Sequence, residues 1–129
     1  MKKVKKLLSA ALALLALFGV SAGIVSASNV VRTLNSASTG DAIRASSSIR
    51  VAANAPAGVN GLRTRASVST GQATNWFEEV RANNIPSTFT LTTNTVTSSH
   101  ASASATGQFQ YRRTATNAWQ PTTVITRTH

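Results

Sequence analysis

Two stretches of strict alternation constrain the fold of this chain more than any other feature. In residues 43–53, one parity is apolar and only Ser47 interrupts it: Ile43, Ala45, Ile49, Val51 and Ala53. The other parity is polar: Arg44, Ser46, Ser48 and Arg50. Residues 62–70 alternate in the same way, with Leu62, Thr64, Ala66 and Val68 opposite Arg63, Arg65, Ser67 and Ser69. Because successive strand residues point to opposite faces, a period of two predicts half-buried β-strands.

Shorter signals predict turns and strands along the rest of the chain. A short strand is expected at residues 30–34 and a turn at 36–41, because Gly and Asp accept the dihedral angles of turns. Asn60-Gly61 predicts a tight turn. Residues 87–97 predict two short strands, and 124–128 a last one. We expect a hairpin with the loop Ala105-Thr106-Gly107, in which Ala103 faces Phe109.

Residues 75–84 are the one segment that favours a helix. Asn75 is a capping residue, and Glu78 follows three positions later, as in a capping box. Ile85-Pro86 would end the helix. The fold class predicted is therefore all-β: a small antiparallel β-sandwich or barrel of about six or seven short strands with at most one short helix, preceded by a signal-peptide helix.

The N-terminus has the three parts of a secretory signal in order. Four lysines within the first six residues precede an apolar run from Leu7 to about Val20, and Val25-Ser26-Ala27 is a small-x-small step. We predict a signal peptide at residues 1–27 and a single secreted, extracellular β domain at 28–129, with a signal of bacterial type. The alternative is an uncleaved membrane anchor, because residues 7–25 are nearly long enough to span a bilayer.

The composition predicts a small hydrophobic core for this domain. Cleavage after Ala27 leaves 102 residues, which is one domain by length. They include no cysteine, so no disulfide staples the fold. Leu, Ile, Val and Phe together make 18 of the 102, below the level of about a fifth at which disorder competes with folding. We expect a folded domain of low stability, with disorder as the alternative.

Groups that catalysis requires are scarce. Residues 28–129 contain two histidines, His100 and His129, and three acids, Asp41, Glu78 and Glu79. A serine nucleophile needs a base and an orienting group, and no Gly-x-Ser-x-Gly elbow is present. A metal site would need three or four ligands, which two distant histidines do not supply. We therefore expect no enzymatic activity, no metal and no cofactor.

Arginine is the feature that points to a function. Residues 28–129 hold nine arginines and no lysine against three acids, a formal charge of +6. If the two alternating strands pair, their arginines lie on one sheet surface. Such a surface attracts anionic cell-envelope or extracellular polymers, or a membrane surface. The predicted contact residues are Arg44, Arg50, Arg63, Arg65 and Arg112. The alternative is that arginine serves solubility alone, and specific nucleic-acid binding is not expected.

One short region resembles a known family. His100-Ala101-Ser102-Ala103-Ser104, Gly107, Arg112-Arg113 and Ala118-Trp119 follow an order similar to that in small secreted bacteriocins of the lactococcin type. The resemblance implies a cysteine-free β-sandwich with antimicrobial activity. It covers about twenty of the 102 residues, and the chain lacks the several Tyr, His and Lys residues usual in that family.

Three functions follow from these observations. The first is a secreted, non-enzymatic binding protein that contacts anionic polymers through a basic sheet face. The second is a bacteriocin-like antimicrobial protein. The third is a structural or matrix protein that self-associates through strand edges, because Ser/Thr/Val-rich strands of low charge pair readily at exposed edges.

Overall fold

The computed structural model describes residues 22–23 and 29–129. The predicted signal peptide at 1–27, and its alternative as a membrane anchor, lie outside the described residues except for Ala22–Gly23. In the described part of the chain, no helix has the length and hydropathy that crossing a membrane requires.

The described residues form ten strands and no helix. In chain order these are β1 (Ala22–Gly23), β2 (Val30–Thr39), β3 (Ala42–Val51), β4 (Val59–Val68), β5 (Phe77–Val80), β6 (Thr90–Thr92), β7 (Val96–Ser98), β8 (Ser104–Arg113), β9 (Ala118–Trp119) and β10 (Thr123–Thr128). The all-β class is therefore confirmed. The count exceeds six or seven because β5 replaces the expected helix and because β1 and β9 are two-residue strands.

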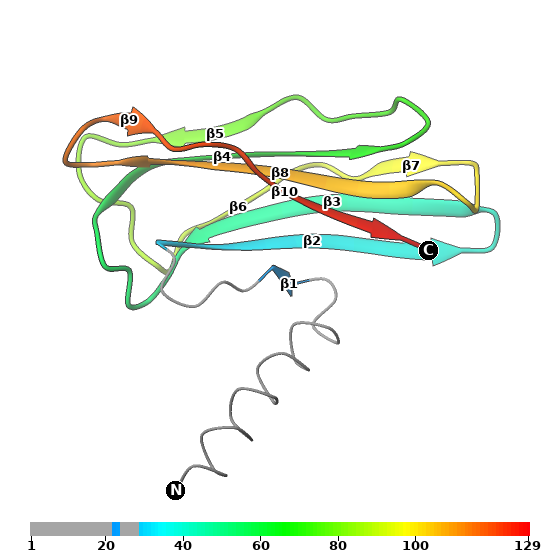
Figure 1. Cartoon of the computed structure of the whole chain (residues 1–129), viewed down its shortest axis with the longest axis horizontal. Helices are drawn as coiled ribbons and strands as arrows, with labels where there is room; N and C mark the ends of the chain where they lie inside the picture. The colour runs from blue at the N-terminus through cyan, green and yellow to red at the C-terminus, as the bar shows by residue number, and fades with distance from the viewer. Residues whose placement is uncertain (1–21, 24–28) are drawn as a thin grey trace, which may run out of the picture.

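The strands form two antiparallel sheets that lie one above the other (Figure 1). Sheet A has the order β1-β2-β3, and both β6 and β7 pair with the far edge of β3. Sheet B has the order β10-β8-β4-β5, and β9 pairs with the end of β8. No strand pairing joins the two ladders among the described residues, so the chain forms two stacked sheets and not a closed barrel.

The core lies between the sheets, and each of its two clusters draws on both. The first combines Val30, Ile49 and Val51 of sheet A with Val59, Leu62 and Phe109 of sheet B, and adds Ile85. The second combines Leu34, Ile43 and Ala45 of sheet A with Val68 and Ala105 of sheet B, and adds Ala103. Because both sheets contribute to each cluster, neither sheet has a core of its own.

The two alternating stretches form the strands that their pattern predicted. In β3 the apolar parity from Ile43 to Val51 is buried, and Ser47 is buried with it. In β4, Leu62, Thr64, Ala66 and Val68 are buried while Arg63 and Arg65 are partly exposed. One face of each strand packs in the core, which is the condition that produces a period of two.

The predicted helix at residues 75–84 is wrong. Phe77–Val80 is the extended strand β5, which pairs with β4 in the register Gly61↔Val80 and Arg63↔Glu78. So short a helix is marginal on local signals alone. Pairing with the edge of β4 instead satisfies the backbone of this segment through sheet hydrogen bonds.

Three predicted turns are strands. Residues 36–39 continue β2, and only Gly40-Asp41 turn, with Gly40 at φ 61°. Asn60-Gly61 lies within β4, at a bulge where the register with β8 shifts. β8 runs straight through Ala105-Thr106-Gly107, so Ala103 does not face Phe109. At Gly107 a Cβ atom would lie 2.7 Å from Cζ of Phe109, so this glycine makes room for a core ring instead of forming a turn.

Candidate anion-binding surface

The five arginines predicted to share one surface lie on opposite faces of the molecule. β3 pairs with β2, β6 and β7, whereas β4 pairs with β5 and β8, so the two alternating strands belong to different sheets. Arg44 and Arg50 point outward from sheet A, and Arg63, Arg65 and Arg112 point outward from sheet B. The expected single basic face is therefore wrong, because it required β3 and β4 to pair with each other.

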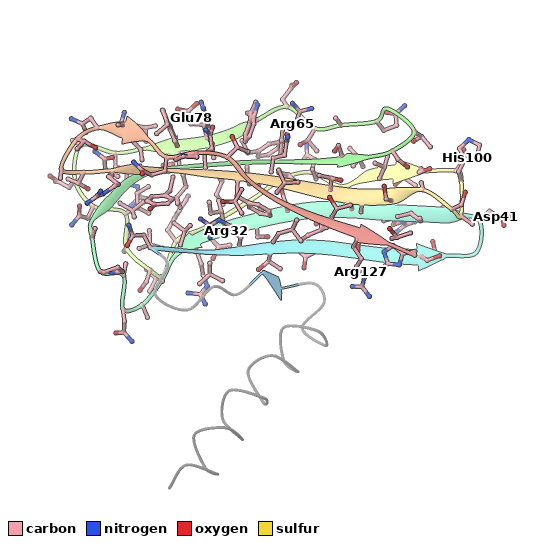
Figure 2. The ribbon with its side chains drawn as sticks, in the orientation of Figure 1. Arg32, Asp41, Arg65, Glu78, His100 and Arg127 are labelled. Atoms are coloured by element: carbon pink, nitrogen blue, oxygen red, sulfur yellow. The ribbon has the colours of Figure 1, made fainter. Side chains whose placement is uncertain are left out.

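The outer face of sheet B brings three arginines next to two glutamines. The register of β4 with β8 is Gly61↔Arg112, Arg63↔Gln110 and Arg65↔Gln108, so these side chains are neighbours on one face. Figure 2 shows Arg65 on this outer layer, away from sheet A. Flat sheet faces hold such rows in fixed register, because cross-strand neighbours have Cβ atoms only about 5 Å apart.

Arg63 lies at the centre of this face between two tryptophans. Its Cζ atom is 4.4 Å from the ring centroid of Trp119 and 5.3 Å from that of Trp76. Arg65 approaches Trp76 as well, at 5.7 Å. These are cation–π distances, at which the ring face attracts a guanidinium and restricts its movement. We call Arg63, Arg65, Arg112, Trp76 and Trp119 the Arg–Trp platform.

Neutral amide groups set the orientation of two platform arginines. Nε of Arg63 donates to Oε1 of Gln110, and Nε2 of Gln110 donates to the carbonyl oxygen of Gln120 at 3.1 Å. Nε of Arg112 donates to Oδ1 of Asn60 at 3.0 Å. In both arginines the Nη groups make no hydrogen bond to the described protein.

Asn60 is the buried residue that holds Arg112. It occupies the β4 bulge, is 2% exposed, and donates through Nδ2 to Oδ1 of Asn117 at 2.7 Å. Next to it, Gly61 has no side chain, which allows Arg112 and Trp119 to approach. A Cβ there would lie 2.8 Å from Cβ of Arg112 and 3.1 Å from Cη2 of Trp119. Bulges commonly re-aim side chains, and this one builds the end of the platform.

No ion pair within the described residues neutralises the platform arginines. Arg63, Arg65 and Arg112 form no ion pair in the described part of the chain, where Arg81 Nε pairs with Glu79 Oε1 at 3.6 Å. Glu78 is opposite Arg63 in the β5 register but makes no ion pair with it. An amide accepts a hydrogen bond without cancelling the charge of the donor. The guanidinium groups of Arg63 and Arg112 are therefore held in direction by amides, and their Nη groups can bind an anion in a bidentate manner.

Sequence reasoning missed the tryptophans and Asn60 as parts of this surface. Trp76 and Trp119 are separated along the chain from Arg63, which both contact, and only the folded arrangement of sheet B brings them together. Tyr111, which stands beside Arg112 in the sequence, faces inward instead, where its hydroxyl accepts from Nδ2 of Asn29 at 3.2 Å. The sequence signal for the bulge is Asn60-Gly61, a polar residue and a glycine between the apolar residues Val59 and Leu62 at the start of the strand.

Arg32 belongs to neither outer surface. It shares the inward parity of β2 with Val30 and Leu34 and is 8% exposed, between the two layers (Figure 2). Burial lowers the pKa of its guanidinium below the ordinary value, and the nearby Tyr111 partly opposes that shift.

The acids and histidines do not assemble into a further site. Glu78 and Glu79 are consecutive strand residues and point to opposite faces of β5, so they do not flank one bond. Within the described residues, no group of three or more His, Cys, Asp or Glu side chains is placed to hold a metal ion.

Comparison with protein-family models, with curated proteins and with solved structures found no match.

Proposed function

We propose that the two stacked sheets form a secreted, non-enzymatic β-sandwich that binds an anionic glycopolymer, of the cell envelope or extracellular space, on the Arg–Trp platform. The observation that carries this proposal is the orientation of Arg63 and Arg112 by neutral amides, which leaves their charge and Nη donors for a ligand. Carboxylate, sulfate and phosphate groups accept paired hydrogen bonds from such donors.

The tryptophans favour a sugar polymer over a simple polyanion. Trp76 is 37% exposed although it is a large apolar side chain, and both of its arginine neighbours carry charge beside the ring. Flat aromatic surfaces match the apolar faces of sugar rings, and interface energetics concentrate on Trp and Arg. An acidic sugar unit supplies both the apolar face and the anion that the platform would contact.

Tryptophan fluorescence tests this proposal, because Trp76 and Trp119 are the only tryptophans of the chain. The purified protein is titrated with a short oligogalacturonate and, in parallel, with its uncharged methyl ester. We expect the acidic oligomer to change the emission and the ester to bind at least about tenfold more weakly, since each charge-assisted hydrogen bond contributes about 1.5–3 kcal/mol.

Two single variants provide the matched comparison. Arg112→Gln should raise the dissociation constant about tenfold or more, whereas Arg50→Gln, which removes the same charge from the outer face of sheet A, should change it less than about twofold. Equal effects of the two variants would mean attraction by net charge alone and would contradict the platform.

Two other outcomes would support the alternative functions. Killing of cells without polymer binding would support the antimicrobial alternative. Sedimentable fibres would support the strand-assembly alternative.

A further inference from the structure

Sheet A carries a second basic feature, on the face opposite the platform. A groove of about 610 Å³ lies at the end of this sheet nearest the β2–β3 turn. Its polar lining includes Arg44 of β3, Arg127 of β10, and Asn35, Ser46, Thr95 and Thr97. None of the described residues that line it is acidic. The register explains the position of Arg44, which lies between Ala37 of β2 and Thr97 of β7 on the outward parity.

Arg127 reaches this groove from the other sheet. Ile125, two residues earlier on the same parity of β10, packs against both core clusters, so this face of β10 points toward sheet A. Arg127 continues that row beyond the core, and its side chain extends past β2 (Figure 2). Nε2 of His129 and Oγ of Ser36 are hydrogen-bonded at 2.8 Å, which ties the end of β10 to β2. Arg44 and Arg127, from different sheets, therefore line the same groove.

The two guanidinium groups are available to a ligand. Neither Arg44 nor Arg127 makes an ion pair or a side-chain hydrogen bond in the part of the chain that the structure describes. The hydroxyl groups of Ser46, Thr95 and Thr97 add donors around them. Two like charges that share a groove repel each other, and an anion bound between them relieves the repulsion. Carboxylate, sulfate and phosphate groups fit this set of donors.

We propose that this groove is a second site for the same class of acidic polymer, so that one protein molecule bridges two polymer chains. The inference rests on the proposed function of the platform. The platform faces outward from sheet B and the groove from sheet A, so a stiff polymer segment on one does not reach the other. Bivalent contacts raise the strength with which a molecule is retained in a polymer mesh.

The number of sites is measured with an oligogalacturonate too short to bridge. Calorimetry counts all bound oligomers, whereas tryptophan fluorescence reports on the platform alone, because both tryptophans lie there. We expect two oligomers per protein by calorimetry. Arg44→Gln should reduce this number to one and leave the fluorescence titration unchanged within about twofold, and Arg127→Gln should do the same.

Arg50→Gln is the matched control, because it removes the same charge from the same outer face of β3. It should leave two oligomers bound. With long polygalacturonate, wild-type protein and Arg50→Gln should raise the hydrodynamic radius of the polymer by light scattering, and Arg44→Gln should abolish the increase. Sedimentation of the protein without polymer checks that dimers are not responsible for bridging.

The outcomes separate the two proposals. One oligomer bound to the wild-type protein with a fluorescence change, or two still bound to Arg44→Gln, would overturn the groove and leave the platform. Oligomer binding that produces no fluorescence change and is lost in Arg44→Gln would overturn the platform as the primary site while locating anion binding in the groove.

Discussion

Ser47, the serine among the apolar residues on the inner face of β3, is hydrogen-bonded to a second buried hydroxyl group. Oγ of Ser47 lies 2.7 Å from Oγ1 of Thr64 in the opposite sheet, and Thr64 donates to the carbonyl oxygen of Gln108 at 2.8 Å. A hydroxyl has one proton, so Ser47 must be the donor to Thr64. The sequence shows Ser47 as a defect in the pattern, whereas the fold uses it to join the two sheets.

These hydrogen bonds predict the effect of Thr64→Val. The substitution keeps the shape of the side chain but leaves the Ser47 hydroxyl without its acceptor and the Gln108 carbonyl without this donor. We expect the free energy of unfolding in urea to fall by about 1–3 kcal/mol. Adding Ser47→Ala to this variant should cost less than Ser47→Ala alone, since its partner is already lost. Additive effects of the two substitutions would show that the hydroxyls are not coupled.

At the scale of elements, β8 shows why a local turn signal fails. Thr-Gly between small alternating residues favours a hairpin, yet the parity of Ala105, Gly107 and Phe109 is buried along one straight strand. A Cβ at Gly107 would lie 2.7 Å from Cζ of Phe109 and 3.4 Å from Cδ1 of Leu34, both fully buried side chains. Gly107 is thus a packing residue, and nothing in the local sequence separates that role from a turn.

Gly107→Ala tests this role. We expect the free energy of unfolding to fall by about 1–3 kcal/mol, because the added methyl group overpacks a core that has no room to adjust. In a Phe109→Leu background, which removes the far end of the ring, the same substitution should cost clearly less. A cost that is equal in both backgrounds would contradict packing against the ring and would favour a backbone requirement for glycine at this position.

The sequence predicts β3 and β4 best, because each has one fully buried face. β3, β4, β6, β7 and β10 all follow from alternation or apolar runs. β5 and the β4 bulge were not predicted, because each forms in response to a neighbour in the sheet: β5 pairs along β4, and the bulge holds Arg112 through Asn60. At these positions, pairing with a neighbouring strand determines the backbone conformation, and the local capping and turn signals do not.

At the scale of the whole molecule, the partition of strands between the two sheets decides which arginines share a face. The alternation places every predicted arginine on an outward parity, but it contains no information on which strands pair. The same five residues therefore form either one basic face or two opposed ones, and the structure has two. The core determines which of these two arrangements forms, because its clusters require the apolar faces of β3 and β4 to oppose each other.

That shared core predicts a single unfolding transition for both sheets. Ile49 of sheet A packs in one cluster with Leu62 and Phe109 of sheet B, whereas Trp76 and Trp119 report on sheet B. Urea transitions followed by tryptophan fluorescence and by far-ultraviolet circular dichroism should therefore coincide. Ile49→Val should lower the free energy of unfolding by about 0.5–1.5 kcal/mol and move both transitions equally, although the substitution is in the other sheet. A dichroism transition that moves while the fluorescence transition stays would mean that sheet B is stable alone. A fixed arrangement of the two arginine-bearing faces, and with it the proposed bridging, would then no longer follow from the fold.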